Sequence, residues 1–169
     1  MSSAKELMAV VFDSPYKAAQ ARAVLHRIQG EELREIVETA IIVRGQDGKA
    51  HVSQDANIPV KHQKIGHAAG LIAAAVAGSF PLILASTPVG RLIGRLKENE
   101  ITNSFVKDVG KGLQPGTSAI VLLGRSGSDP GQKILGRLQT WNPTIVKSDL
   151  PQEIECEIES TLESGVIIG

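Results

Sequence analysis

Aromatic residues and cysteine are both scarce in this chain of 169 residues, which has three Phe, one Tyr, one Trp and one Cys. Proteins that stack bases or sugars on their surface use more aromatic side chains than this. The single cysteine, Cys156, excludes an internal disulfide and suits a reducing compartment. The core must therefore be built from Val, Ile, Leu and Ala.

The chain also lacks an excess of charge of either sign, because 18 basic residues stand against 18 acidic ones. Such a balance creates no overall field that would attract nucleic acid. The first twenty residues do not read as a secretory signal peptide, since Lys5, Glu6, Asp13 and Lys17 interrupt them. We expect a cytoplasmic protein with no nucleic-acid partner.

The sequence has no motif that is typical of catalysis or metal binding. It contains no G-x-x-x-x-G-K-[ST] loop, and the spacing of His62 and His67, with His51 as a third candidate, is poor for metal ligands. We expect no enzyme activity, no catalytic residue, no cofactor and no metal site. One alternative stays open: Gly124–Gly131 follows a strand and precedes a helix, so its amides and Arg125 are candidates for holding an anion.

Apolar runs and turn residues predict an alternation of strands and helices. The Asp47-Gly48 pair favours a tight hairpin between two strands, and Ser14-Pro15 and Asp129-Pro130 are typical helix starts. A further helix is expected to start at Asn103 or Ser104. Ile154, Ile158 and Leu162 lie four apart and predict a last helix. The expected strands are Leu7–Phe12, Thr39–Arg44, Lys49–Gln54, Ala119–Leu123 and Thr144–Lys147.

This order of elements is β-α-β-β, an insertion, and α-β-α-β-α. If the insertion and one helix are left out, the remaining order of elements is the split β-α-β pattern of ferredoxin-like domains. We therefore expect an α+β protein, a single ferredoxin-like α/β sandwich over residues 1–169.

The insertion is the most distinctive segment, because Ile65 to Gly90 contains no Asp, Glu, Lys or Arg. Its length invites a membrane-spanning interpretation, but Pro81 and Pro88 favour two helical legs, about Ile65–Phe80 and Leu82–Leu96. A single crossing would also separate strands that should share one sheet. The sequence thus predicts an inserted apolar helical hairpin over residues 65–96.

Small residues recur every four positions along both legs, as in a glycine zipper. Such spacing lets helix backbones approach closely and favours self-association. The basic residues around the hairpin are candidates for contact with anionic lipid headgroups. The small residues are Gly66, Gly70, Ala74, Gly78, Ser86, Gly90 and Gly94. The basic residues are Lys61, Lys64, Arg91, Arg95 and Lys97.

The chain resembles the bacterial family known as domain of unknown function 1269. The resemblance rests on the opening A-V-V-F-D, the R-G-Q-D-G-K hairpin, the Gly/Ala-rich insertion, the block F-V-K-D-V-G-K-G-L-Q-P-G-T-S-A-I and the late S-D-L-P-Q-E. It implies a membrane-associated protein without an assigned reaction, and it carries over no catalytic residues.

Together these expectations describe a non-enzymatic protein that forms homo-oligomers through its hairpin at the cytoplasmic face of a membrane. Two alternatives remain. In the first, the hairpin packs inside a soluble oligomer and does not contact lipid. In the second, the chain is a soluble regulatory domain that binds a small ligand or an anion.

Overall fold

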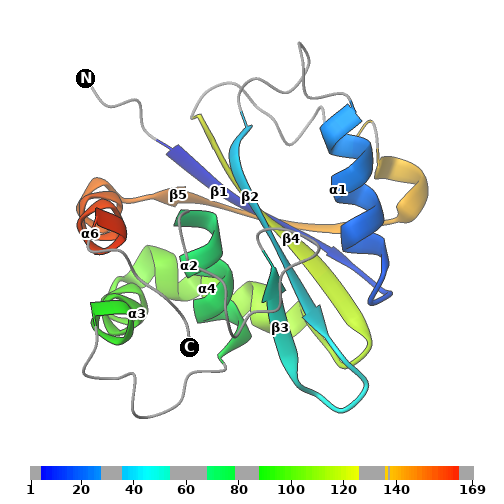
Figure 1. Ribbon diagram of the computed structural model, residues 1–169, viewed down its shortest axis with the longest axis horizontal. Helices are drawn as coiled ribbons and strands as arrows, with labels where there is room; N and C mark the ends of the chain where they lie inside the picture. Colours follow the sequence, from blue (N-terminus) through cyan, green and yellow to red (C-terminus); the bar gives the residue numbers. More distant parts are fainter. Residues whose placement is uncertain are drawn as a thin grey trace.

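A computed structural model describes residues 5–27, 36–53, 68–78, 88–125, 136 and 138–163 (Figure 1). The described part is an α+β structure with one five-stranded antiparallel sheet and five α-helices. The strands are β1 (Lys5–Phe12), β2 (Ile36–Arg44), β3 (Ala50–Ser53), β4 (Thr117–Arg125) and β5 (Thr144–Leu150). The helices are α1 (Lys17–Arg27), α2 (Ala68–Ala77), α3 (Pro88–Glu98), α4 (Glu100–Gly112) and α6 (Gln152–Glu163).

The strands follow the order β3-β2-β4-β1-β5, and every neighbouring pair is antiparallel. Strands β1 and β2 consequently run in the same direction with β4 between them. The turn that joins β2 to β3 contains Gly48 at a φ of 82°, a conformation that glycine adopts without strain. The β2–β3 hairpin, before the charge-free segment, and β4, after it, therefore share one sheet, which confirms the prediction that these strands belong together.

Both faces of the sheet are covered, and the central strands alternate between two apolar clusters. In β1, Leu7, Ala9 and Val11 belong to one cluster, whereas Met8 and Val10 belong to the other. Strand β4 alternates in the same way. A strand that is buried on both sides needs apolar residues at every position, which explains the continuous runs LMAVVF and AIVLL.

The helices lie in two layers. Helix α1 covers one face and packs on the cluster that contains Met8 and Val10. Leu138 also belongs to this cluster, and Trp141, from a short 3-10 turn (Gln139–Trp141), packs against it. Helices α2, α3, α4 and α6 lie on the other side of the sheet (Figure 1). The hydroxyl of Ser118 joins α1 to β4, because it accepts from Ala18 N–H at 3.1 Å and donates to the Ser14 carbonyl at 2.6 Å.

Helix α2 is the centre of the larger layer and belongs to the charge-free segment Ile65–Gly90. All of its residues from Ala69 to Ala77 are buried, and it packs on β2, β3 and β4 as well as on α3, α4 and α6. It ends at Ala77 rather than at Phe80, since Gly78 takes a φ of 68° and its N–H bonds the Ala74 carbonyl at 3.2 Å. The apolar residues of this helix thus pack against the sheet of their own chain.

Helix α4 begins earlier than the sequence suggested. The prediction of a cap at Asn103 or Ser104 is wrong, because Asn99 caps the helix and accepts from the N–H groups of Ile101 and Thr102. The hydroxyl of the buried Thr102 also donates to the Leu96 carbonyl at 2.5 Å, which ties α4 to the end of α3. The predicted last helix is confirmed as α6, with Ile154 and Ile158 in the core.

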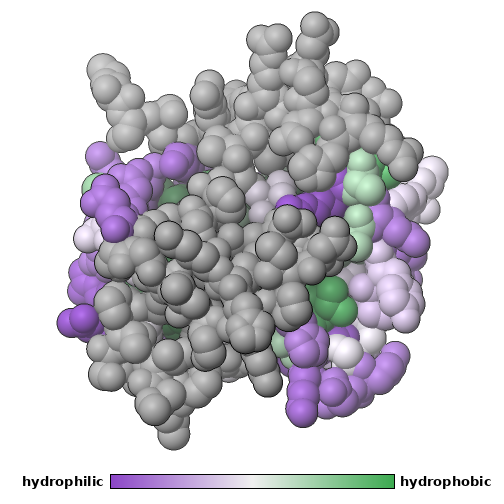
Figure 2. Space-filling model, in the orientation of Figure 1, coloured by the Kyte–Doolittle hydropathy of each residue, from purple (hydrophilic) through white to green (hydrophobic). Residues whose placement is uncertain are grey.

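None of the described helices combines the length and apolar composition that crossing a bilayer requires. In the space-filling view, hydrophilic residues gather where α6 and α3 reach the surface, at the left edge (Figure 2).

Candidate functional site

Helices α3 and α6 form a polar groove at the outer side of the helical layer. Each helix is amphipathic, and each turns its apolar side into the core: Leu92, Ile93 and Leu96 from α3, and Ile154 and Ile158 from α6. Their polar sides therefore meet at the surface, where the two helices run antiparallel.

Two polar contacts hold the groove closed at one end. The Asn99 side-chain amide donates to Glu153 at 2.9 Å. Arg95 binds Glu157 through both Nε and NH2, with NH2 at 2.7 Å and Nε at 2.9 Å from Oε1. The hydrogen bond and the charge of Glu157 raise the pKa of Arg95, which favours the charged form of this guanidinium.

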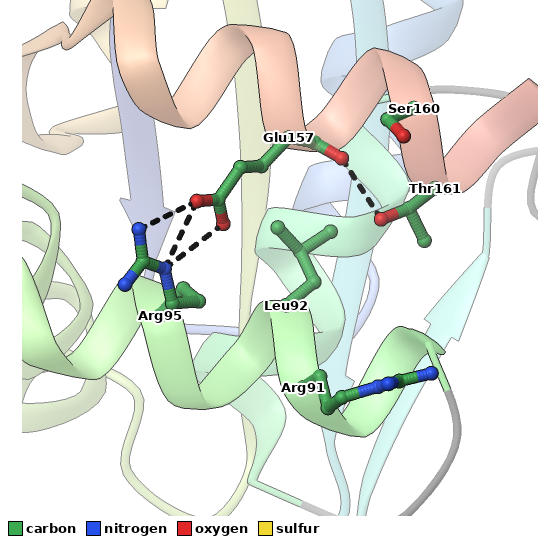
Figure 3. Close-up of a pocket in the computed structure, with 6 residues that line it drawn as sticks. All are labelled: Arg91, Leu92, Arg95, Glu157, Ser160 and Thr161. Carbon is green, nitrogen blue, oxygen red and sulfur yellow. Dashed lines mark hydrogen bonds and ion pairs between the residues drawn. The ribbon is translucent and has the colours of Figure 1, made fainter.

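The other end of the groove is open. A hollow of about 240 Å³ is lined by Arg91, Leu92, Arg95, Glu157, Ser160 and Thr161. In Figure 3, the side chain of Arg91 extends along α3 away from the Arg95–Glu157 pair. The Thr161 hydroxyl donates to the Glu157 carbonyl at 2.8 Å. Beside the Arg95–Glu157 pair, the hollow thus combines the guanidinium of Arg91 with two hydroxyl groups and the apolar side chain of Leu92.

The predicted row of small residues is divided between the interior and the surface. Gly70 and Ala74 are buried in α2, and Gly78 is exposed just after its end. Gly90 and Gly94 are partly exposed on α3, and nothing lies within 4 Å of the place where a Cβ of Gly94 would stand. The two other members, Gly66 and Ser86, lie outside the described residues.

The basic residues predicted at the headgroups are likewise divided. Arg91, Arg95 and Lys97 are all exposed on α3, and Arg95 is already paired with Glu157. Lys61 and Lys64 lie outside the described residues.

Sequence reasoning did not find the α6 side of this groove. Glu153 and Glu157 lie four apart, as do Arg95 and Asn99, and this matched spacing was the available signal. It could not be used without knowing that the two helices are neighbours, since more than fifty residues separate them in the sequence.

The remaining candidates do not gather into a site in the described part. His51 is exposed on β3, Cys156 is exposed on α6, and His62 and His67 lie outside the described residues. The described residues contain no group of three or more His, Cys, Asp or Glu side chains placed to hold a metal ion. Most of the Gly124–Gly131 segment also lies outside them.

The structure is thus that of an α+β protein whose sheet is covered on both faces and which has a surface groove between two amphipathic helices. Residues 63–163 match a family model described as protein of unknown function (DUF1269), and the chain belongs to this family. No curated protein and no solved structure matches the chain significantly.

Proposed function

We propose that this chain is a non-enzymatic interaction protein that self-associates through the outer face of α3, at the cytoplasmic surface of a membrane. The observation that carries the proposal is the placement of Gly90 and Gly94. These glycines are four apart on a partly exposed helix face, whereas Gly70 and Ala74 are enclosed by their own chain. A pair of small residues at this spacing lets a second helix approach closely.

The proposal includes a particular fold. We infer a single domain over residues 1–169 in which β5, β1, β4 and β2 form a ferredoxin-like sheet with α1 on one face. The strand order supports this inference, as does the common direction of β1 and β2, which flank β4 as antiparallel neighbours. In this view the insertion at residues 65–96 contributes α2 and most of α3 to a second helical layer, which α4 and α6 complete, on the face that a two-layer sandwich would leave open.

Attachment to a membrane would rely on charge rather than on insertion of α3. The apolar side of α3 is buried in the core, so only its polar side is available to a lipid surface. Arg91 and Lys97 are exposed there, and no ion pair involves either of them in the described part of the chain. The cytoplasmic leaflet carries the anionic lipids that such cations attract, at about 1 kcal/mol per residue.

Gly94→Leu tests the self-association. Within one chain the new side chain meets open space, and leucine favours a helix more than glycine does, so the protein should fold normally. We expect the variant to be monomeric by light scattering at concentrations where the unsubstituted chain forms oligomers.

Gly110→Leu is the matched control, because Gly110 is also a partly exposed helical glycine with nothing within 4 Å of a Cβ, but on α4. It should leave the mass unchanged. A monomeric unsubstituted chain, or an equal effect of the two variants, would refute self-association through α3.

Flotation with vesicles tests the membrane part separately. The chain should float with phosphatidylcholine vesicles that contain phosphatidylglycerol and not with pure phosphatidylcholine, and high salt should release it because salt screens surface charges. Flotation that is independent of lipid charge would contradict this mechanism.

A soluble, anion-binding regulatory domain is the second candidate. The hollow beside Arg91 favours it, because its cation and hydroxyl groups suit an anion whether or not a membrane is present. A saturable rise in melting temperature with an anionic metabolite, together with a failure to float, would favour this function over the first.

A further inference from the structure

Contacts between α3 and α6 recur at steps of four residues on both helices. Asn99 contacts Glu153, and Arg95 contacts Glu157. The next step on each helix brings Arg91 opposite Thr161, and both line the same hollow. At the first two positions α6 supplies a carboxylate, whereas at the third it supplies only a hydroxyl. Arg91 is therefore the one arginine of the groove that has no carboxylate opposite it.

We propose that this third position is a binding site for a phosphate-type oxyanion, held by the Arg91 guanidinium with the hydroxyl groups of Thr161 and Ser160. The anion would take the place that a carboxylate occupies at the two other positions. It can come from a lipid headgroup or from a free phosphate. In the first case the site rests on the proposed membrane attachment, and it gives that attachment a specific point of contact.

The charge of the hollow favours an anion. Among its lining residues, the charges of Arg95 and Glu157 neutralise each other, which leaves the positive charge of Arg91. Helix α6 carries further carboxylates, but Glu159 and Glu163 do not line the hollow.

A hydroxyl rotates about its Cβ–O bond, so it can direct its proton towards an anion. Thr161 Oγ1 donates to the Glu157 carbonyl, but in a helix that carbonyl also receives the backbone N–H four residues later. It stays hydrogen-bonded when the hydroxyl rotates. A guanidinium offers two parallel N–H groups to a phosphate, which makes Arg91 a stronger ligand than a lysine in this place.

Titration of the whole chain with inorganic phosphate tests the site itself. Backbone amide signals of Arg91 and Thr161 should shift saturably in NMR spectra, and sodium chloride of equal ionic strength should not reproduce the shift. Arg91→Gln should abolish the response. Lys97→Gln removes an exposed cation of the same helix that does not line the hollow, so it should keep the response.

Vesicles with phosphatidylglycerol test the lipid source with the same two variants. A cation that lies near an anionic surface without making a specific contact raises the binding constant about fivefold. We expect a loss of that size for Lys97→Gln and about tenfold or more for Arg91→Gln, because Arg91 also loses charge-assisted hydrogen bonds.

The outcomes separate this inference from the proposed function. A saturable phosphate response without vesicle binding supports the site with a soluble anion and contradicts membrane attachment. Vesicle binding that both variants weaken equally, with no phosphate response, overturns the site and leaves membrane attachment intact.

Discussion

In the described part of this molecule, single polar residues hold secondary-structure elements together, as Ser118 illustrates. Ser118 is fully buried, and its hydroxyl both accepts from the first turn of α1 and donates to the loop before it. The two bonded groups come from residues about a hundred positions earlier in the chain. This one hydroxyl therefore fixes the start of α1 on the sheet.

Ser118→Ala should destabilise the fold by about 1–3 kcal/mol, because it leaves the Ala18 N–H and the Ser14 carbonyl without their buried partner. Urea unfolding measures the change. Ser104→Ala, on the exposed side of α4, should change stability by less than about 0.5 kcal/mol. Similar effects of the two substitutions would show that the buried hydrogen bonds matter little.

The ion pair at the start of α1 makes a prediction about pH. Lys17 Nζ lies 2.6 Å from Asp13 Oδ1, and this hydrogen bond with the lysine charge lowers the pKa of Asp13. A carboxylate with a lowered pKa favours folding above its unfolded-state pKa, and this contribution is lost as the pH falls through the folded-state value. In NMR titrations, Lys17→Gln should raise the midpoint of Asp13, whereas Lys107→Gln on α4 should not move it.

At the scale of the helices, glycine has two different roles: one glycine ends a helix and another lies inside one. Gly78 ends α2 in a left-handed conformation, whereas Gly94 lies within α3 in ordinary helical conformation. In the sequence each of the two glycines belongs to a row of small residues four apart, one row on each predicted leg. The spacing does not distinguish their roles, because spacing alone does not tell where a helix stops.

Gly78→Ala should therefore destabilise the fold by about 1–2 kcal/mol, since a Cβ disfavours the left-handed conformation. Gly94→Ala should stabilise it by about 0.5–1 kcal/mol, because alanine loses less backbone entropy in a helix and finds open space here. Denaturant unfolding at low protein concentration compares them. Changes of the same sign would contradict this assignment.

For the whole molecule, the two helical layers share the central strands and should unfold together. Trp141 reports on the α1 face, where its ring packs edge-on against Phe12 at 6.0 Å. Helices α2, α3, α4 and α6, on the other face, dominate the far-ultraviolet circular dichroism. We expect the fluorescence and dichroism transitions to coincide. An earlier loss of dichroism would mean that the layer of α2, α3, α4 and α6 unfolds independently of the sheet.

The amino-acid sequence alone determined the strands with their apolar runs, the β2–β3 turn and the last helix, because these features depend on local periodicity and turn chemistry. The family resemblance was also available from local motifs, and the match over residues 63–163 supports it. The exact starts and ends of helices were harder to predict, as the cap at Asn99 illustrates.

Only the tertiary structure decided where α2, the described helix of the charge-free segment, packs. An apolar helix has the same composition whether it meets lipid, another copy or its own sheet, and contacts that are distant in sequence make the choice. Here the sheet face buries α2. The α3–α6 groove could not be predicted from the sequence either, because Arg95 and Glu157 become partners only when the fold brings two helices that are remote in sequence side by side.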